Sequence, residues 1–164
     1  IIKPTPNVRN LPLLSLTAEY ALRIMIFLTE RKDGFATSEQ IATATKVPAG
    51  YSVKVLQQLG RAGYVSGQRG RKGGFYLACN PKEVNLLEIV DVIDPLNRIE
   101  VCPLGRADHK NCLCPLHSQL DKTIEGLQKN LSDMTLQNVI DGSIGRTLCQ
   151  DASQAVFQIK ISDK

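Results

Sequence analysis

Three cysteines and a histidine are crowded into one short stretch of the chain. Cys102, Cys112 and Cys114 follow the spacing C-x9-C-x-C, and His117 comes three residues after the last of them. Thiolates bind soft and borderline metals and iron–sulfur clusters, and an imidazole nitrogen is a suitable fourth donor. The residues therefore predict a metal centre, either an iron–sulfur cluster or a tetrahedral zinc site. A thiol switch, in which two of the three cysteines form a disulfide, is a third interpretation.

The composition of the whole chain argues against a secreted disulfide scaffold and against a membrane protein. The 164 residues include five cysteines, an odd number, and are 43% hydrophobic and 22% charged, which is ordinary for a globular protein. The longest strongly apolar run is 24–28, far shorter than the roughly 20 residues that span a bilayer. We therefore expect a cytoplasmic protein that is not bound to a membrane.

A second chemical feature is a long segment without carboxylates. Between Gln40 and Lys82 there is no Asp or Glu, yet the segment holds seven Lys and Arg residues. The net charge of the whole chain is only +4, so the positive charge is concentrated here. A surface without carboxylates suits a polyanion, because each phosphate that Lys or Arg neutralises releases condensed counterions. The segment predicts a nucleic-acid partner, and a solvated basic face without a partner is the alternative.

The elements around this segment follow the order of a winged helix-turn-helix. Capping signals, apolar periodicity and glycine content predict an irregular arm over 1–13, helices over 15–31, 37–47 and 49–62, and a strand–turn–strand hairpin over 64–77. In such a module the second helix of the pair enters the major groove, and the hairpin reaches the flanking backbone or the minor groove. We therefore assign 14–80 to a DNA-binding domain.

The second half of the chain is organised differently. A helix over 86–94 lies in a connecting region, 81–98, which leads to the cysteine loop, 99–116. A long helix over 117–141 follows, and 142–164 form a polar tail. Along the long helix an apolar seam has the spacing 3, 4, 3, 4, 3, through His117, Leu120, Ile124, Leu127, Leu131 and Met134. A seam this narrow favours a partner helix, here a second copy of the chain, with packing on its own domain as the alternative. The predicted fold is mainly α with a small β-wing, a winged helix-turn-helix plus a long dimerisation helix.

The candidate DNA contacts lie on the helix over 49–62 and at the hairpin tip. Amide, lysine and tyrosine side chains suit base edges and phosphates, and the exposed face of this helix is expected to present Tyr51, Ser52, Lys54, Gln57 and Gln58. The tip adds three cations, and arginine is favoured in a narrow minor groove. The whole set of predicted contacts is Ser15, Thr17, Tyr20, Ser38, Gly50, Tyr51, Lys54, Gln58, Arg69, Arg71 and Lys72.

An enzyme is not expected from these residues. General acid–base or nucleophilic catalysis needs paired carboxylates, or a nucleophile beside a base. The local grouping of this kind is Cys114-x-x-His117, which is better explained as a pair of ligands. The glycines between 67 and 74 are not followed by Gly-Lys-Ser/Thr, so a phosphate-binding nucleotide loop is disfavoured as well.

Together these residues resemble the IscR/NsrR (Rrf-two) family of bacterial transcriptional regulators. The resemblance covers roughly residues 14–140 and is carried by 15–23, 41–42, 48, 50–51, 55–59, 62–63, 69–75, 89–90, the cysteine loop and the long helix. It implies homodimers that bind palindromic operators in double-stranded DNA. Many such regulators sense redox state, nitric oxide or iron–sulfur status through a cluster held between the dimerisation helix and the DNA-binding domain of the partner. We expect a repressor of this kind.

The resemblance also implies a ligand set. The three loop cysteines are the expected cluster ligands, and the fourth ligand is either His117 or a carboxylate in the first helix of the partner subunit, where Glu19 stands. Here the middle cysteine lies next to the third instead of midway, so both a 2Fe–2S and a 4Fe–4S cluster stay open. The alternative is a regulator of the same fold without a cluster, which switches by thiol oxidation, zinc or a protein partner.

Overall fold

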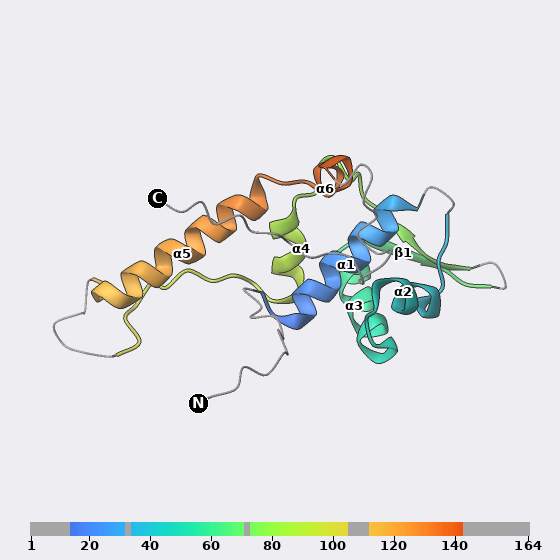
Figure 1. Cartoon of the computed structure of the whole chain (residues 1–164). Helices are drawn as coiled ribbons and strands as arrows, with labels where there is room; N and C mark the ends of the chain where they lie inside the picture. Colours follow the sequence, from blue (N-terminus) through green and yellow to red (C-terminus); the bar gives the residue numbers. More distant parts are fainter. Residues whose placement is uncertain (1–13, 32–33, 71–72, 105–111, 143–164) are drawn as a thin grey trace, which may run out of the picture.

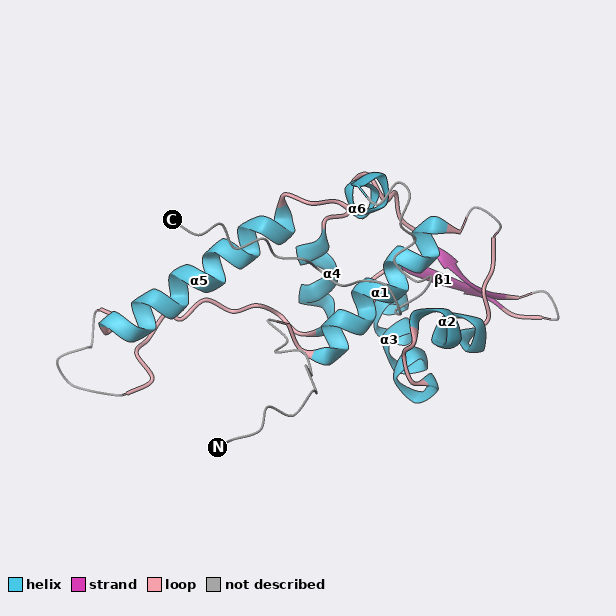
Figure 2. Cartoon of the chain, viewed as in Figure 1, coloured by secondary structure: helices cyan, strands magenta, loops and turns pink. Residues whose placement is uncertain are grey.

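A computed structural model of the chain describes residues 14–31, 34–70, 73–104 and 112–142. The elements in chain order are α1 (Leu16–Glu30), α2 (Ser38–Thr45), α3 (Ala49–Arg61), β1 (Val65–Gln68), β2 (Gly74–Leu77), α4 (Leu86–Ile93), α5 (Pro115–Ser132) and α6 (Leu136–Gly142). The structure is mainly helical, with a small two-stranded antiparallel sheet (Figure 2). It confirms the predicted fold class. The predicted arm, 1–13, and residues 143–164 of the predicted tail lie outside the described residues.

The helices of the predicted DNA-binding domain, 14–80, begin where local signals place them. The Ser15 hydroxyl accepts a hydrogen bond from the Ala18 amide at 3.2 Å and caps α1. At the start of α2, Thr37 and Gln40 form both hydrogen bonds of a capping box. At the end of α3, Gly63 takes a positive φ of 84°, and the Tyr64 amide donates back to the Leu59 carbonyl. This glycine turn directs the chain from α3 into β1, so it fixes the wing relative to α3.

The wing is a hairpin that is tied to the connection between α1 and α2. β1 and β2 pair in register from Val65 opposite Leu77 to Gln68 opposite Gly74. Ala36 adds a bridge to Phe75, with hydrogen bonds of 2.9 and 2.8 Å between the two backbones. A Cβ atom at Gly74 would lie 2.6 Å from the Ala36 carbonyl oxygen, so glycine is needed for this close approach.

The apolar core is built around α1, which packs against α2, α3, α4 and α6. Its largest fully buried side chains come from five helices: Ile24, Met25, Ile41, Val55, Leu56, Leu59, Ile89, Val90 and Leu136. Leu136 belongs to α6, which follows α5, so the chain returns to the core after α5. Figure 1 shows α6 beside the DNA-binding part and α5 lying away from it.

The stretch predicted as one helix over 117–141 is divided in the structure, so that prediction is wrong. α5 ends at Ser132, and α6 begins at Leu136. Between them, the Met134 carbonyl accepts from the Leu86 amide at 2.9 Å, and the Leu136 amide donates to the Val84 carbonyl at 3.0 Å. Backbone groups that pair with the segment before α4 are not available for a continuous helix. Met134 is therefore outside the helical seam of α5.

α5 packs much less than the other long helices. None of its residues is fully buried, and Leu116 and Leu120 have exposed fractions of 62% and 46%. The chain that follows α4 runs alongside α5 in the opposite direction (Figure 1). Among the described helices, none is both long and apolar enough to cross a membrane.

Candidate metal centre and nucleic-acid interface

The structure brings two of the predicted thiol ligands and the predicted imidazole ligand together. One donor atom from each of Cys102, Cys114 and His117 lies within 4.8 Å of the other two. His117 Nδ1 is 3.1 Å from the Cys114 Sγ and 3.5 Å from the Cys102 Sγ. Both cysteines are buried, whereas the histidine is half-buried. Two shielded thiols and an imidazole nitrogen at this spacing fit a metal such as zinc or iron.

Two separate segments supply these donors. Cys114 is the residue before α5, and Pro115 begins the helix, a position in which proline is well tolerated. His117 follows in the first turn, so the local helix geometry sets its position relative to Cys114. Cys102 comes from the extended chain after α4 and reaches the same point from the other side. The site therefore exists only while this extended chain stays in place beside α5.

Cys112 is placed differently from the other two predicted thiol ligands. It is exposed, and it does not belong to the group formed by Cys102, Cys114 and His117. The structure thus assembles three donors from one chain, and a tetrahedral centre needs one more. The middle of the cysteine loop, 105–111, lies outside the described residues.

Glu19, the other predicted ligand, is bound to a neighbour on its own helix. Its carboxylate forms an ion pair with Arg23, one turn further along α1. The Arg23 guanidinium lies 6.0 Å from the centre of the Tyr20 ring, and Tyr20 meets the Tyr51 ring edge-on at 5.9 Å. These contacts link Glu19 to α3. Its role as a ligand for a partner subunit stays a prediction.

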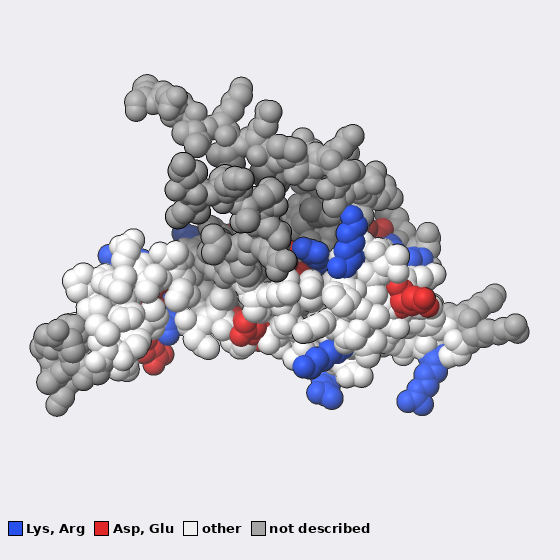
Figure 3. Space-filling model, turned by 60° about the horizontal axis from the view of Figure 1, so that its bottom comes forward, with Lys and Arg blue, Asp and Glu red and all other residues white. Residues whose placement is uncertain are grey.

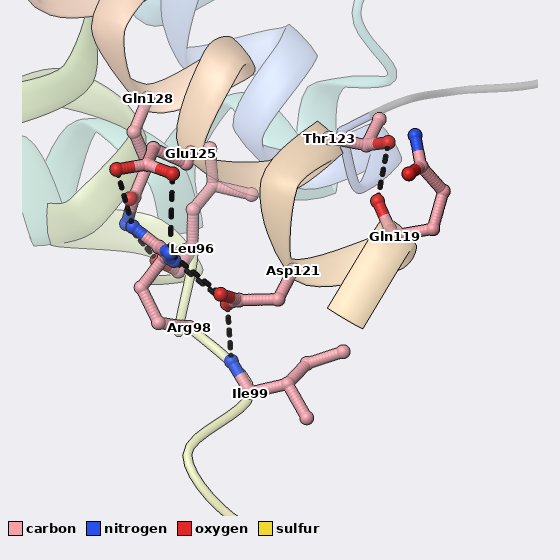
Figure 4. A network of polar contacts seen from close by, with 8 residues as sticks. All are labelled: Leu96, Arg98, Ile99, Gln119, Asp121, Thr123, Glu125 and Gln128. Atoms are coloured by element: carbon pink, nitrogen blue, oxygen red, sulfur yellow. Dashed lines mark hydrogen bonds and ion pairs between the residues drawn. The ribbon is translucent and has the colours of Figure 1, made fainter. Parts of the chain in front are cut away.

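A polar clamp holds the extended chain onto α5 (Figure 4). The Arg98 guanidinium donates two hydrogen bonds to Asp121, at 2.7 and 2.5 Å, and its outer nitrogens contact Glu125 at 3.3 Å. The Ile99 amide donates to the same Asp121 carboxylate at 2.9 Å. Because the Arg98 guanidinium and the Ile99 amide favour the charged carboxylate, the pKa of Asp121 is lowered to about 2. Asp121 also raises the pKa of Arg98 above its ordinary value.

Most of the residues predicted to contact DNA from α3 lie at the surface, and their role in binding stays a prediction. Gly50, Tyr51, Lys54 and Gln57 are exposed, and Gln58 is half-buried. Ser52 is an exception, because its side chain is fully buried and its hydroxyl has no hydrogen-bond partner. It shares the inward stripe of α3 with Val55, Leu56 and Leu59, at the spacing of one helix face. The expectation that Ser52 is presented to DNA is therefore wrong.

Predicted DNA contacts from α1 and α3 meet at one hollow in the surface. A cavity of about 280 Å³ is lined by Ser15, Thr17, Tyr51, Lys54, Gln58, Ile93 and Asp94. Ser15 and Thr17 lie at the N-terminal end of α1. Tyr51, Lys54 and Gln58 lie on α3. Ile93 and Asp94 come from the end of α4, so the Asp94 carboxylate lines the same hollow as Lys54. The hollow thus joins the candidate DNA face to the segment that leads towards Cys102.

The remaining predicted contacts lie outside that hollow. Ser38 begins α2 and is half-buried, and Tyr20 is half-buried against Tyr51. Arg69 is exposed directly after β1, while Arg71 and Lys72 lie outside the described residues. Lys and Arg side chains project from the lower right edge of the molecule in Figure 3, and the acidic side chains in that part lie further in.

Comparisons with known proteins agree with this architecture. Residues 14–142 match the Rrf2 family, described as an iron-dependent transcriptional regulator. The chain belongs to the Rrf2 family. One relative is the HTH-type transcriptional regulator NsrR of Bacillus licheniformis, 32% identical over 126 residues, which cover 74% of this chain and 87% of the relative. The resemblance seen in the sequence is thereby confirmed, and the chain is an Rrf2-family transcriptional regulator.

Solved structures show the same fold at lower identity. The IscR of T. potens has a TM-score of 0.64 and 21% identity, covering 79% of this Rrf2 chain and 87% of that one. CymR, the global cysteine regulator of B. subtilis, has the same TM-score and identity and covers 79% and 96%. At this level of identity, the similarity confirms the winged-helix fold alone.

Sequence reasoning on this Rrf2 chain missed the clamp of Arg98, Asp121 and Glu125. Its two sides are more than twenty residues apart, and no periodic pattern links them. Asp121 and Glu125 are four residues apart on α5, which marks a shared helix face but does not say what the face binds.

Proposed function

We propose that this Rrf2-family chain is a cytoplasmic, homodimeric repressor that binds palindromic operators in double-stranded DNA. The observation that carries the proposal is the hollow where the N-terminal end of α1 meets Tyr51, Lys54 and Gln58 of α3. Three hydroxyls, the Gln58 amide and the Lys54 cation at one surface suit a phosphate backbone and base edges, with Asp94 as the carboxylate that also lines the hollow. In this arrangement α3 enters the major groove, and Arg69 on the wing reaches the flanking DNA.

The second half of the proposal concerns dimerisation. The seam residues Leu120, Ile124, Leu127 and Leu131 lie on α5, and none of them is fully buried in the single chain. Apolar residues at this spacing form a seam that a second helix covers. Pairing two copies through α5 places two α3 helices against two half-sites of a palindrome.

We propose that Cys102, Cys114 and His117 hold an iron–sulfur cluster, with a fourth donor from Cys112 or from Glu19 of the partner subunit. The family description as an iron-dependent regulator and the donor set support this assignment. When bound, such a cluster changes charge or is lost on reaction with oxidants or nitric oxide. The 2Fe–2S and 4Fe–4S forms both stay open.

The chain itself provides a route from this centre to the DNA face. Cys102 lies on the segment that begins at the end of α4, and Ile93 and Asp94 at that end line the hollow beside Lys54. The Leu96 amide also donates to Asp91 of α4 at 3.2 Å. If Cys102 leaves the centre, the segment loses its anchor beyond the Arg98–Asp121 contact, and we propose that the resulting change in its path is transmitted to the end of α4. A coupling of about 1–3 kcal/mol between the two sites is enough for a useful switch.

A second candidate function is a thiol switch without a cluster. The Cys102 and Cys114 thiols lie within 3.5 Å of the same imidazole nitrogen, so the two sulfurs are near each other. Transfer of two electrons and two protons from these thiols to a peroxide forms a disulfide and releases two water molecules, or one water and one alcohol from an alkyl hydroperoxide. This disulfide would join the same two segments that the metal centre joins.

Anaerobic purification distinguishes these candidates. We expect a coloured protein with stoichiometric iron and sulfide, and Cys114→Ser should lose both. A colourless, iron-free protein that forms the Cys102–Cys114 disulfide under peroxide would support the thiol switch instead. A colourless protein that does neither would contradict both assignments.

Binding to duplex DNA is tested separately by fluorescence anisotropy. Arg69→Ala is expected to weaken operator binding by about tenfold, the loss of one minor-groove or phosphate contact of 1–3 kcal/mol. Lys129→Ala, which removes an exposed cation from α5, is the matched control and should leave the affinity unchanged. No binding of the wild type even at low ionic strength would overturn the proposal.

A further inference from the structure

The extended chain after α4 lies in a fixed register along α5. Three contacts in antiparallel order define this register: the Gln128 side chain donates to the Leu96 carbonyl at 2.5 Å, Asp121 binds Arg98 and Ile99, and His117 meets Cys102. The α5 residues of these contacts follow one another at about one or two helical turns, so they share one face of the helix. The segment 96–102 is thus aligned with α5 over most of the length of the helix.

The register decides whether the third donor reaches the centre. Cys114 and His117 lie at the start of α5, and the helix sets their separation. Cys102 depends on the path of 96–102, which in an extended chain advances by about 3.3 Å per residue. A shift by one residue would move the Cys102 sulfur out of reach of the other two donors, whose distances to it must be near 4 Å in a shared metal site.

The clamp is the strongest element that opposes such a shift. No residue of α5 is fully buried, so apolar packing contributes less to the register here than it does in the core. Asp121 instead accepts three hydrogen bonds, two of them in a bidentate pair with Arg98, and its side chain is only 15% exposed. Bidentate arginine–carboxylate pairs are directional as well as strong. Three residues separate Arg98 from Cys102, and one helical turn separates Asp121 from His117.

We propose that Arg98 and Asp121 are positioning residues of the metal centre, which hold Cys102 against Cys114 and His117 without touching the metal. This inference rests on the proposed metal centre. It assigns the pair to the alignment of one donor and gives it no part in binding DNA. Outer residues that orient metal ligands typically change metal affinity by about 10–100-fold.

A double-mutant cycle tests the assignment with Co²⁺ as the probe. Co²⁺ affinity is measured under anaerobic conditions, from the thiolate charge-transfer absorption, for the wild type, Cys102→Ser, Asp121→Asn and the double variant. Asp121→Asn is expected to weaken Co²⁺ binding by about tenfold. In the Asp121→Asn background, loss of the Cys102 thiol should have much less effect than in the wild type, because that thiol is already misplaced. Arg98→Gln, which removes the other half of the pair, should give the same result.

Two further measurements separate positioning from general destabilisation. Asp133→Asn, which changes a carboxylate at the far end of α5, is the matched control and should keep wild-type affinity. In the metal-free protein, the rate of disulfide formation between Cys102 and Cys114 under diamide reports their proximity directly. We expect this rate to fall several-fold in Asp121→Asn and to stay unchanged in Asp133→Asn.

The outcomes are distinguishable. If the wild type binds Co²⁺ and the two substitutions are additive, with equal disulfide rates, the clamp does not position Cys102 and the inference is wrong. If the wild type binds no Co²⁺ and also carries no iron or sulfide after anaerobic purification, the proposed metal centre fails. The disulfide rates still decide whether the clamp aligns the two thiols.

Discussion

The DNA-binding part and the arm formed by 94–104 and α5 are held together by different forces. In the DNA-binding part, together with α4 and α6, fully buried apolar side chains from five helices form one core around α1. In the arm, no residue of α5 is fully buried, and the contacts between its two limbs are mainly polar. Apolar burial makes the first region stable by itself. The second region has less of this support, which is compatible with the proposed metal centre and the proposed pairing with a second subunit.

The largest expected difference is in folding stability. Leu59 is fully buried, and Leu59→Ala should lower the free energy of unfolding by about 3 kcal/mol, through lost burial and a cavity. Leu120 has an exposed fraction of 46% in the single chain, so Leu120→Ala should change the unfolding of the DNA-binding part by less than about 0.5 kcal/mol. Urea unfolding followed by circular dichroism measures both. Equal losses would remove the distinction between the two regions.

A charge in the seam of α5 tests whether two copies of the chain pair through the arm. Ile124→Glu is expected to weaken self-association by about a hundredfold, because pairing would bury an unpartnered carboxylate in both subunits. Thr123→Glu adds the same charge on the exposed side of the helix and serves as the control. Sedimentation analysis at several concentrations gives the dissociation constants. A dimer of unchanged strength in Ile124→Glu would place the subunit contact elsewhere.

A smaller effect is expected at the DNA face. Lys54→Ala should lower the slope of log affinity against log salt concentration by about one unit if Lys54 contacts a phosphate. Lys122→Ala removes an exposed cation from the arm and should leave the slope unchanged. Anisotropy titrations at four salt concentrations measure both slopes. Equal slopes in the two variants would mean that the hollow beside Lys54 does not meet the DNA backbone.

The smallest effect is on the acid side of the pH range. The pKa of Asp121 is lowered to about 2, so the clamp favours the charged carboxylate and its contribution is fully present above about pH 4. That contribution is lost as the pH falls towards 2. The stability difference between the wild type and Asp121→Asn should therefore be constant from pH 7 to pH 5 and should shrink below pH 4. Thermal unfolding at each pH measures it, and a difference that grows in acid would contradict the assignment.

The DNA-binding part could be predicted from the sequence because its signals are local. The capping box at Thr37 and Gln40 and the glycine after α3 each act within a few residues. The position of Ser52 was missed, although the spacing to Val55 and Leu59 places it on the inward stripe. At this position the polar residue type and the apolar periodicity point in opposite directions, and the periodicity matches the structure.

The arm was predicted less well because distant contacts decide its structure. Leu131 and Met134 continue the apolar spacing, but pairing with 84–86 ends α5 before Met134. A local signal did exist, since Thr135 and Asn138 cap each other at the start of α6. The clamp on Asp121 and the exposure of Cys112 have no local signature, because they depend on how 96–104 lies against α5.

The bridge between Asn85 and Thr135 determines how the arm is attached. The chain leaves the core after α4 and re-enters it at α6, and the bridge ties the start of α4 to the start of α6. The arm is therefore attached to the core at both of its ends. A displacement at its tip is transmitted to the core through both limbs. The entropic cost of closing a loop rises only weakly with the number of residues in the loop. Arms of different lengths can consequently be attached to the same core without changes to its interior.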